Sequence, residues 1–227
     1  MMRETEDGAK AALYEAFAAT GKALGSGKRL ELLDLLAQGE RSVEDLARTA
    51  GLNVTTASAH LQTLKQAGLV ATRRAGVKVF YRLVSDDVAR LFVLLRQVAQ
   101  AHQPAVGPAR VAFLGPNEGR EFSVAELRAS LRAGTAVLLD VRPVEEYRAG
   151  HIPGALSIPV GELADRIGEL PEGPEVVVYC RGEYCALAYD AVRLLAGQGR
   201  HAVRLTDGML EWRLAGLPVT AGAEAGA

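Results

Sequence analysis

The sequence predicts a multidomain α+β protein, with a mainly helical N-terminal part and an α/β C-terminal part built on a parallel sheet. Apolar residues recur at helical spacing through the first hundred positions. A stretch rich in proline and glycine follows, and beyond it short apolar runs alternate with helical patterns, as in parallel α/β sheets. We therefore expect domains at residues 1–103 and 121–220, a linker at 104–120 and a disordered tail at 221–227.

The composition is that of an ordinary globular protein, with 49% hydrophobic and 23% charged residues in a chain of 227. No apolar run reaches the length of a membrane span, and the N-terminal residues do not resemble a signal peptide. We therefore expect a cytoplasmic protein with no membrane partner. Only two cysteines are present, both in one loop, so they do not form a disulfide framework of the secreted kind. In a reducing compartment such a pair indicates chemistry.

Four helical patterns precede a β-hairpin that turns at Gly76, and a long helix begins near Asp86. A helix, a turn at Gly51, a second helix and a basic hairpin together predict a winged helix-turn-helix. The apolar faces of the four helices are marked, in order, by Leu13, Tyr14 and Phe17; by leucines between Leu30 and Leu36; by Val43, Leu46 and Ala47; and by Val54, Ala57, Leu61 and Leu64.

No acidic residue lies between Asp45 and Asp86, whereas six basic residues do, so this stretch can approach phosphate without repulsion. Small and polar side chains on the outward face of the fourth helix suit the reading of base edges in the major groove. Basic residues on the hairpin would hold phosphates or the minor groove. A winged helix that binds protein instead is the weaker alternative. The expected DNA-binding residues are Thr55, Thr56, Ser58, Ala59 and Gln62 on the helix, and Arg73, Arg74 and Lys78 on the hairpin.

The run from Ser58 to Val70 resembles the ArsR family of bacterial repressors, and the resemblance extends over roughly residues 10–100. It implies a homodimer, paired through the first and last helices, that presents one recognition helix to each half of a double-stranded DNA operator. His60 matches the family signature, which adds it to the expected DNA-binding residues. A helix histidine that packs or caps locally explains His60 at least as well as a DNA contact.

Many members of this family sense metals through a cysteine pair on the helix before the turn, or through Asp and His on the last helix. Residues 42–46 of this chain contain no cysteine, and Asp86 and Asp87 have no histidine near them. We therefore expect no metal site in this domain. Sensing is then expected in the second domain.

Cys180 follows an apolar run, Val176 to Tyr179, that predicts a buried strand, and a helix follows its loop. Backbone amides without helical partners and the positive end of a helix favour a thiolate there. The predicted nucleophile is therefore Cys180. Its loop continues through Arg181, Gly182, Glu183, Tyr184 and Cys185.

The segments from Leu139 to Ala155 and from Asp207 to Val219 closely resemble the rhodanese domain, over roughly residues 121–220. The resemblance implies that Cys180 takes a sulfane sulfur as a persulfide and passes it to an acceptor thiol, with no cofactor. Persulfides, polysulfides and thiosulfate are the expected donors. The loop amides could hold the persulfide anion. The six-residue loop disfavours an oxyanion as large as phosphate, and Glu183 and Cys185 weaken the case for efficient turnover of thiosulfate.

Several residues of the second domain allow two interpretations. Asp140 and Arg142, at the end of a strand, either support the active site through substrate contact or form an ion pair that fixes the loop. Arg181 either attracts an anionic donor or points to solvent. Cys185 is either a resolving thiol or a small buried residue; the second is favoured, since residues five apart around a tight loop need not meet disulfide geometry.

The leading functional hypothesis is a repressor whose C-terminal domain receives sulfur at Cys180 and thereby alters DNA binding. One alternative is primarily a sulfurtransferase with an accessory DNA-binding domain. Another is a regulator whose second domain is catalytically silent and binds a partner. Cys180→Ser separates these hypotheses, because only the first requires the thiol for the response to an inducer.

Overall fold

The computed structural model describes residues 2–116 and 120–222, with side chains from residue 7 onward. The chain separates into two compact units, Met1–Val93 and Leu94–Ala227. Most of the tail that was expected to be disordered lies outside the described residues, from 223 onward. None of the described helices is long and apolar enough to cross a membrane.

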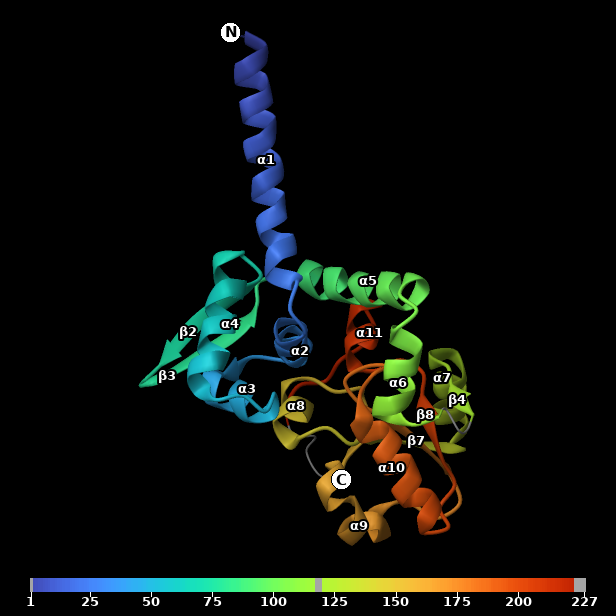
Figure 1. The fold of residues 1–227 in the computed structure, drawn as a ribbon. Helices are drawn as coiled ribbons and strands as arrows, with labels where there is room; N and C mark the ends of the chain where they lie inside the picture. The colour runs from blue at the N-terminus through green and yellow to red at the C-terminus, as the bar shows by residue number, and fades with distance from the viewer. Residues whose placement is uncertain (1, 117–119, 223–227) are drawn as a thin grey trace. The chain divides into compact units, whose positions relative to one another are not determined.

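The first unit is mainly helical and carries a three-stranded antiparallel sheet in the order β1-β3-β2, which confirms the predicted winged helix-turn-helix (Figure 1). The wing turns at Gly76, whose φ of 58° suits glycine. Its elements are α1 (Met2–Leu24), α2 (Gly27–Leu36), β1 (Arg41–Ser42), α3 (Val43–Thr49), α4 (Val54–Gln66), β2 (Val70–Ala75), β3 (Lys78–Leu83) and the first half of α5 (Asp86–His102).

Side-chain caps set the start of α3 and α4. The Ser42 hydroxyl accepts the Asp45 amide at 3.2 Å, and Asn53 Oδ1 accepts the Thr56 amide at 2.8 Å. Helix α4 then buries the side chains of Ala57, Leu61 and Leu64, as predicted. Val54 was expected in the same core but is 49% exposed, because it is the first residue of the helix and precedes the turn that packs.

Helix α1 leaves its apolar face open. In Figure 1 most of α1 extends beyond the other elements of the first unit. Leu13, Tyr14 and Phe17 are 52%, 62% and 64% exposed, and the Tyr14 and Phe17 rings meet edge to face with centroids 6.1 Å apart. Exposed apolar patches are typical of surfaces that bind a partner.

The second unit contains a five-stranded parallel sheet in the order β4-β8-β7-β5-β6, which confirms the predicted α/β part. The segment expected as a linker carries a helix of its own, α6, whose last residue, Leu114, is buried. The α-helices and strands after α5 are α6 (Val106–Leu114), β4 (Glu121–Phe122), α7 (Val124–Ala133), β5 (Ala136–Asp140), α8 (Val144–Ala149), β6 (Leu156–Ser157), α9 (Leu163–Arg166), β7 (Glu175–Tyr179), α10 (Ala186–Gly197), β8 (Ala202–Leu205) and α11 (Met209–Leu214).

Strands β5 and β7 lie side by side in the middle of this sheet and are buried on both faces. Leu138 and Val177 belong to one apolar cluster, whereas Leu139 and Val178 belong to another. Since successive strand residues point to opposite faces, both strands read as continuous apolar runs. Their carboxyl ends bring the loops that follow them, including the one that begins at Cys180, to one edge of the sheet.

Replacing Asn53 by Ala removes the side-chain acceptor at the start of α4, so we expect the free energy of unfolding of the first unit to fall by about 1 kcal/mol. Asn53→Ser keeps an acceptor and serves as the control. Urea titration of the full chain, followed by the helical circular dichroism signal, measures the change. An unchanged transition in the Ala variant would contradict this role for Asn53.

Candidate functional site: the cysteine loop and the DNA-binding face

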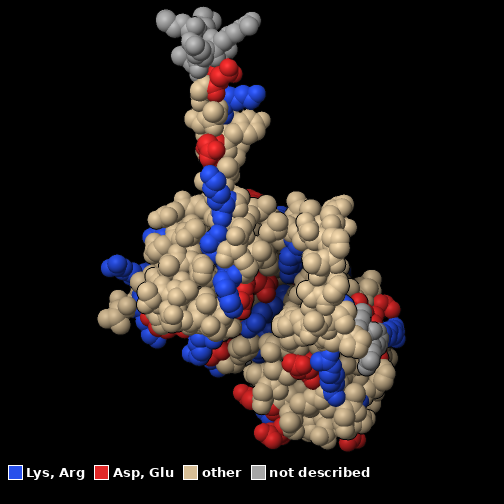
Figure 2. All heavy atoms as spheres, viewed as in Figure 1, with Lys and Arg blue, Asp and Glu red and all other residues tan. Residues whose placement is uncertain are grey.

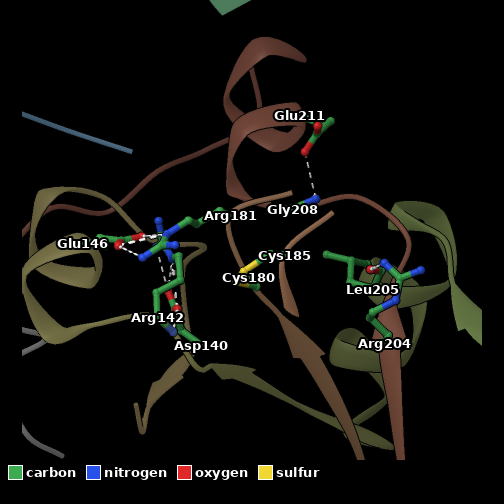
Figure 3. Close-up of a disulfide and its surroundings, with 10 residues drawn as sticks. All are labelled: Asp140, Arg142, Glu146, Cys180, Arg181, Cys185, Arg204, Leu205, Gly208 and Glu211. Carbon is green, nitrogen blue, oxygen red and sulfur yellow. Dashed lines mark hydrogen bonds and ion pairs between the residues drawn. A yellow bond between two sulfur atoms is a disulfide. The ribbon is translucent and has the colours of Figure 1, made fainter. Parts of the chain in front are cut away.

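Cys180 and Cys185 form a disulfide at the carboxyl end of β7 (Figure 3). Cys180 is 2% exposed, while Cys185 is half-buried and stands directly before the first residue of α10. Their Cα atoms are 6.2 Å apart, inside the usual range for a disulfide. The preference for Cys185 as a merely buried residue was therefore wrong, because the loop curls tightly enough to bring the two sulfurs together.

The first turn of helix α11 fixes the curled loop through two backbone hydrogen bonds. The amides of Met209 and Leu210 donate to the carbonyl oxygens of Cys180 and Arg181, at 2.9 and 3.0 Å. The Cys185 amide closes the turn by donating to the Gly182 carbonyl at 3.1 Å. A Cβ on Gly208 would lie 2.2 Å from the Gly182 nitrogen, so only glycine allows this approach.

In the curled loop, three successive backbone amides are positioned to bind an anion. Within the described residues, the backbone amides of Gly182, Glu183 and Tyr184 donate no hydrogen bond to the backbone. Successive amides in a tight turn form a concave site for anions. The loop can therefore hold a thiolate or a persulfide anion by backbone groups alone.

Arg181 does not point to solvent, which was one of the two roles expected of it. Its guanidinium forms a bidentate ion pair with Glu146 of α8, with nitrogen–oxygen distances of 2.6 to 3.0 Å. Glu146 is 2% exposed, and the Arg181 side chain is 15% exposed. The charge of Arg181 is thus neutralised by the protein, as Figure 3 shows on one side of the disulfide. Sequence reasoning missed Glu146 because nothing in its own segment marks it.

Asp140 and Arg142 form an ion pair, which is the second of the two roles expected for them. Both side chains are fully buried, and Arg142 Nη2 lies 2.7 Å from Asp140 Oδ2. The Tyr179 hydroxyl donates to the same carboxylate at 2.5 Å, and Arg142 also donates to the Gly150 carbonyl. Burial, together with the charge of Asp140, raises the pKa of Tyr179 well above its ordinary value, so the phenol stays protonated and remains a donor.

Glu211 is a second carboxylate that sequence reasoning did not place in the site. One of its oxygens accepts the Gly208 amide at 3.0 Å. A Cβ built on Gly182 would lie 3.1 Å from that oxygen, so the carboxylate stands directly against the loop (Figure 3). Its position three residues after Gly208, at the start of a helix, was the available signal. Burial and the charge of Glu211 raise the pKa of Asp207.

The expected recognition residues lie on α4 of the first unit. Thr55, Ala59 and Gln62 are exposed, whereas Thr56, Ser58 and His60 are half-buried. Gln62 is not fully available, because its amide nitrogen donates to the Tyr81 hydroxyl of β3 at 2.9 Å. This bond links the recognition helix to the wing.

Arg73, Arg74 and Lys78 all lie exposed on the wing, as expected. Arg73 is nevertheless paired with Glu40, which precedes the acid-free stretch and was overlooked for that reason. The Arg73 guanidinium, through its hydrogen bonds, lowers the pKa of Glu40. A phosphate at Arg73 would have to displace this carboxylate, which leaves Arg74 and Lys78 as the more accessible cations.

Helix α1 does not extend the basic face. Figure 2 shows acidic and basic side chains mixed along it, and the chain there alternates charges from Asp7 and Lys10 to Glu15 and Lys22. Glu15 and Lys22 form an exposed ion pair at 3.1 Å. Among the described residues, no group of three or more His, Cys, Asp or Glu side chains could hold a metal ion.

Comparison with known proteins agrees with both halves of the chain. Residues 123–215 match the family described as rhodanese-like domain, and residues 26–72 match bacterial regulatory protein, arsR family. The chain is 55% identical over 217 residues to HTH-type transcriptional regulator Rv0324 of Mycobacterium tuberculosis, and the match covers 96% of each chain.

Two shorter similarities each lie within one half of the chain. A sulfurtransferase of Allochromatium vinosum is 37% identical over 86 residues, which span 37% of this chain and 78% of that protein. The solution structure of the homodimeric winged helix-turn-helix DNA-binding domain of Mb0332 from Mycobacterium bovis is 55% identical. That match covers 42% of this chain and 89% of the other, with a TM-score of 0.40.

Asp140→Asn removes the charge that balances Arg142 in a site closed to water, so we expect the free energy of unfolding of the second unit to fall by about 3–5 kcal/mol. Asp190→Asn is the matched control, since its ion pair with Arg193 is exposed, and a change below about 1 kcal/mol is expected there. Urea titration of both full-length variants tests the contrast. Equal effects would show that the buried pair does not hold the site.

Proposed function

Because the chain belongs to the ArsR-family transcriptional regulators that carry a rhodanese-like domain, we propose that it is a repressor whose Cys180 senses sulfane sulfur. One observation carries this proposal: the rhodanese-like loop presents two cysteines that join in a disulfide. A sulfurtransferase that must turn over needs its cysteine returned to the thiol form in each cycle. A sensor instead needs a product that persists, and a disulfide is such a product.

The proposed reaction has two steps. The Cys180 thiolate attacks the sulfane sulfur of a low-molecular-weight persulfide or polysulfide, forms a persulfide on Cys180 and releases the donor's thiol. The Cys185 thiolate then attacks the Cys180 sulfur, forming the Cys180–Cys185 disulfide and expelling hydrosulfide. The two cysteines lose two electrons and the sulfane sulfur gains them, so no other oxidant is needed.

The surroundings of the loop support thiol-type donors over thiosulfate. Arg181 is neutralised by Glu146, Glu211 is paired with Arg96, and Glu183 adds a negative charge within the loop itself. A doubly charged donor is repelled by such a carboxylate, whereas a persulfide with one charge or none is repelled less. Slow transfer from thiosulfate is therefore expected, and sensing is favoured over turnover as the main role.

In this proposal the first unit binds a double-stranded DNA operator as a homodimer in the cytoplasm. The exposed apolar residues of α1, together with Leu91, Leu94 and Val98 of α5, supply apolar area for pairing. Helix α4 and the wing would then meet the operator, one copy for each half-site. The disulfide at the cysteine loop would weaken this binding and release the promoter.

Cys180→Ser tests the sensing step. We expect the variant to bind its upstream region with unchanged affinity, and to lose the response to polysulfide that the wild type shows in a gel-shift titration. Cys185→Ser should still accept sulfur at Cys180, detected as a gain of one sulfur atom by mass spectrometry, without releasing sulfide. If Cys180→Ser responds to polysulfide like the wild type, the thiol is not the sensor.

Arg74→Ala tests the wing. Loss of one phosphate contact should weaken operator binding by a similar factor for all sequences and reduce the slope of log affinity against log salt by about 1. Arg90→Ala, on α5 beside Asp87, removes an equal charge away from the wing and should leave the slope unchanged. Identical slopes for Arg74→Ala and the wild type would exclude Arg74 from the interface.

A further inference from the structure

The second unit begins at Leu94, so the last turns of α5 belong to it. These turns contact Glu211 of α11, the helix that holds the cysteine loop. Arg96 Nη2 lies 2.6 Å from Glu211 Oε1, and each side chain is only 18% exposed. An ion pair shielded to this degree is worth more than a surface pair and depends closely on its geometry.

Arg96 also covers a residue of the loop itself. Its guanidinium carbon lies 5.3 Å from the centre of the Tyr184 ring, a cation–π distance. One turn further along α5, the Gln100 amide approaches the Glu183 carboxylate at 3.5 Å. Helix α5 therefore meets two of the four residues that separate the cysteines.

The ion pair stands against the loop backbone as well. A Cβ built on Gly182 would lie 3.1 Å from Glu211 Oε2 and 3.5 Å from Arg96 Nη1. No free space therefore separates the Arg96–Glu211 pair from the middle of the loop. When the bond between Cys180 and Cys185 opens or closes, the backbone between them cannot change its curl without displacing this pair.

We infer that Arg96 is the residue through which the state of the cysteine loop is transmitted to α5. With the disulfide formed, the loop is held in the curl to which Arg96, Glu211 and Tyr184 are fitted. With the thiols separate, α11 still holds the carbonyl oxygens of Cys180 and Arg181, but residues 182–184 are no longer tied at Cys185, and the contacts of Arg96 rearrange. The effect on DNA rests on the proposed function, whereas the response of α5 to the disulfide does not.

Helix α5 is suited to carry this change because its faces have different contacts. Val88, Ala89 and Phe92 are buried in its first half. Leu91, Leu94 and Val98, spaced by three and four residues, form an exposed apolar row. Arg96 follows Val88 by eight residues, roughly 12 Å along the same helix.

The test compares the full-length protein reduced with dithiothreitol and oxidised with diamide, which sets the disulfide without any sulfur donor. Amide hydrogen exchange over residues 94–102 reports on α5. We expect a clear difference between the two forms of the wild type, and its loss in Arg96→Gln. Glu211→Gln should act in the same direction while keeping an acceptor for the Gly208 amide. Arg90→Gln is the matched control on the same helix, because Arg90 pairs with exposed Asp87.

Two results would overturn the inference: equal exchange in both forms of the wild type, or a full difference that persists in Arg96→Gln. Mass spectrometry confirms that each variant forms the disulfide. Operator affinity of the same samples adds a second readout, with an expected ratio between reduced and oxidised wild type of about 5–150-fold that falls toward 1 in Arg96→Gln. Failure of polysulfide to oxidise the cysteines, with the exchange difference intact, would refute the proposed function alone.

Discussion

The thiol site depends on the hydrogen bonds by which the first amides of α11 hold the carbonyl oxygens of Cys180 and Arg181. These bonds turn the loop between β7 and α10 into a curl, and the curl brings Cys185 to Cys180. Gly208 makes the approach feasible, because any side chain there would collide with the Gly182 backbone. The reactive arrangement is thus imposed by an element some thirty residues further along the chain, and not by the loop sequence alone.

Charged side chains around the loop form ion pairs within the protein. Asp140 with Arg142, and Glu146 with Arg181, each balance within the protein and are shielded from water. Such pairs fix geometry and contribute little net charge to a ligand. In the proposed function, an anion at the sulfur would therefore be stabilised by backbone dipoles, which need no counter-ion and do not depend on salt as an exposed cation would.

One continuous helix, α5, belongs to both units of the chain. A regulator of this kind needs a chemical event in one unit to change an equilibrium in the other by a few kcal/mol, and in the proposed function α5 is the element that would carry this change. In the proposed homodimer, the exposed apolar row on α5 would add a third connection, to a second copy of the chain.

The sequence by itself determined the two folds and located the basic stretch and the cysteine loop, because these depend on local periodicity, on residue spacing and on charge within a short segment. It did not determine the partners of its charged residues. Arg73 pairs with Glu40 across 33 positions, Arg181 with Glu146 across 35 and Arg96 with Glu211 across 115. Only the tertiary structure decides such pairs, since any of many carboxylates could serve until the packing of strands and helices brings one within reach. The disulfide was decided in the same way, by the contacts of α11 with the loop.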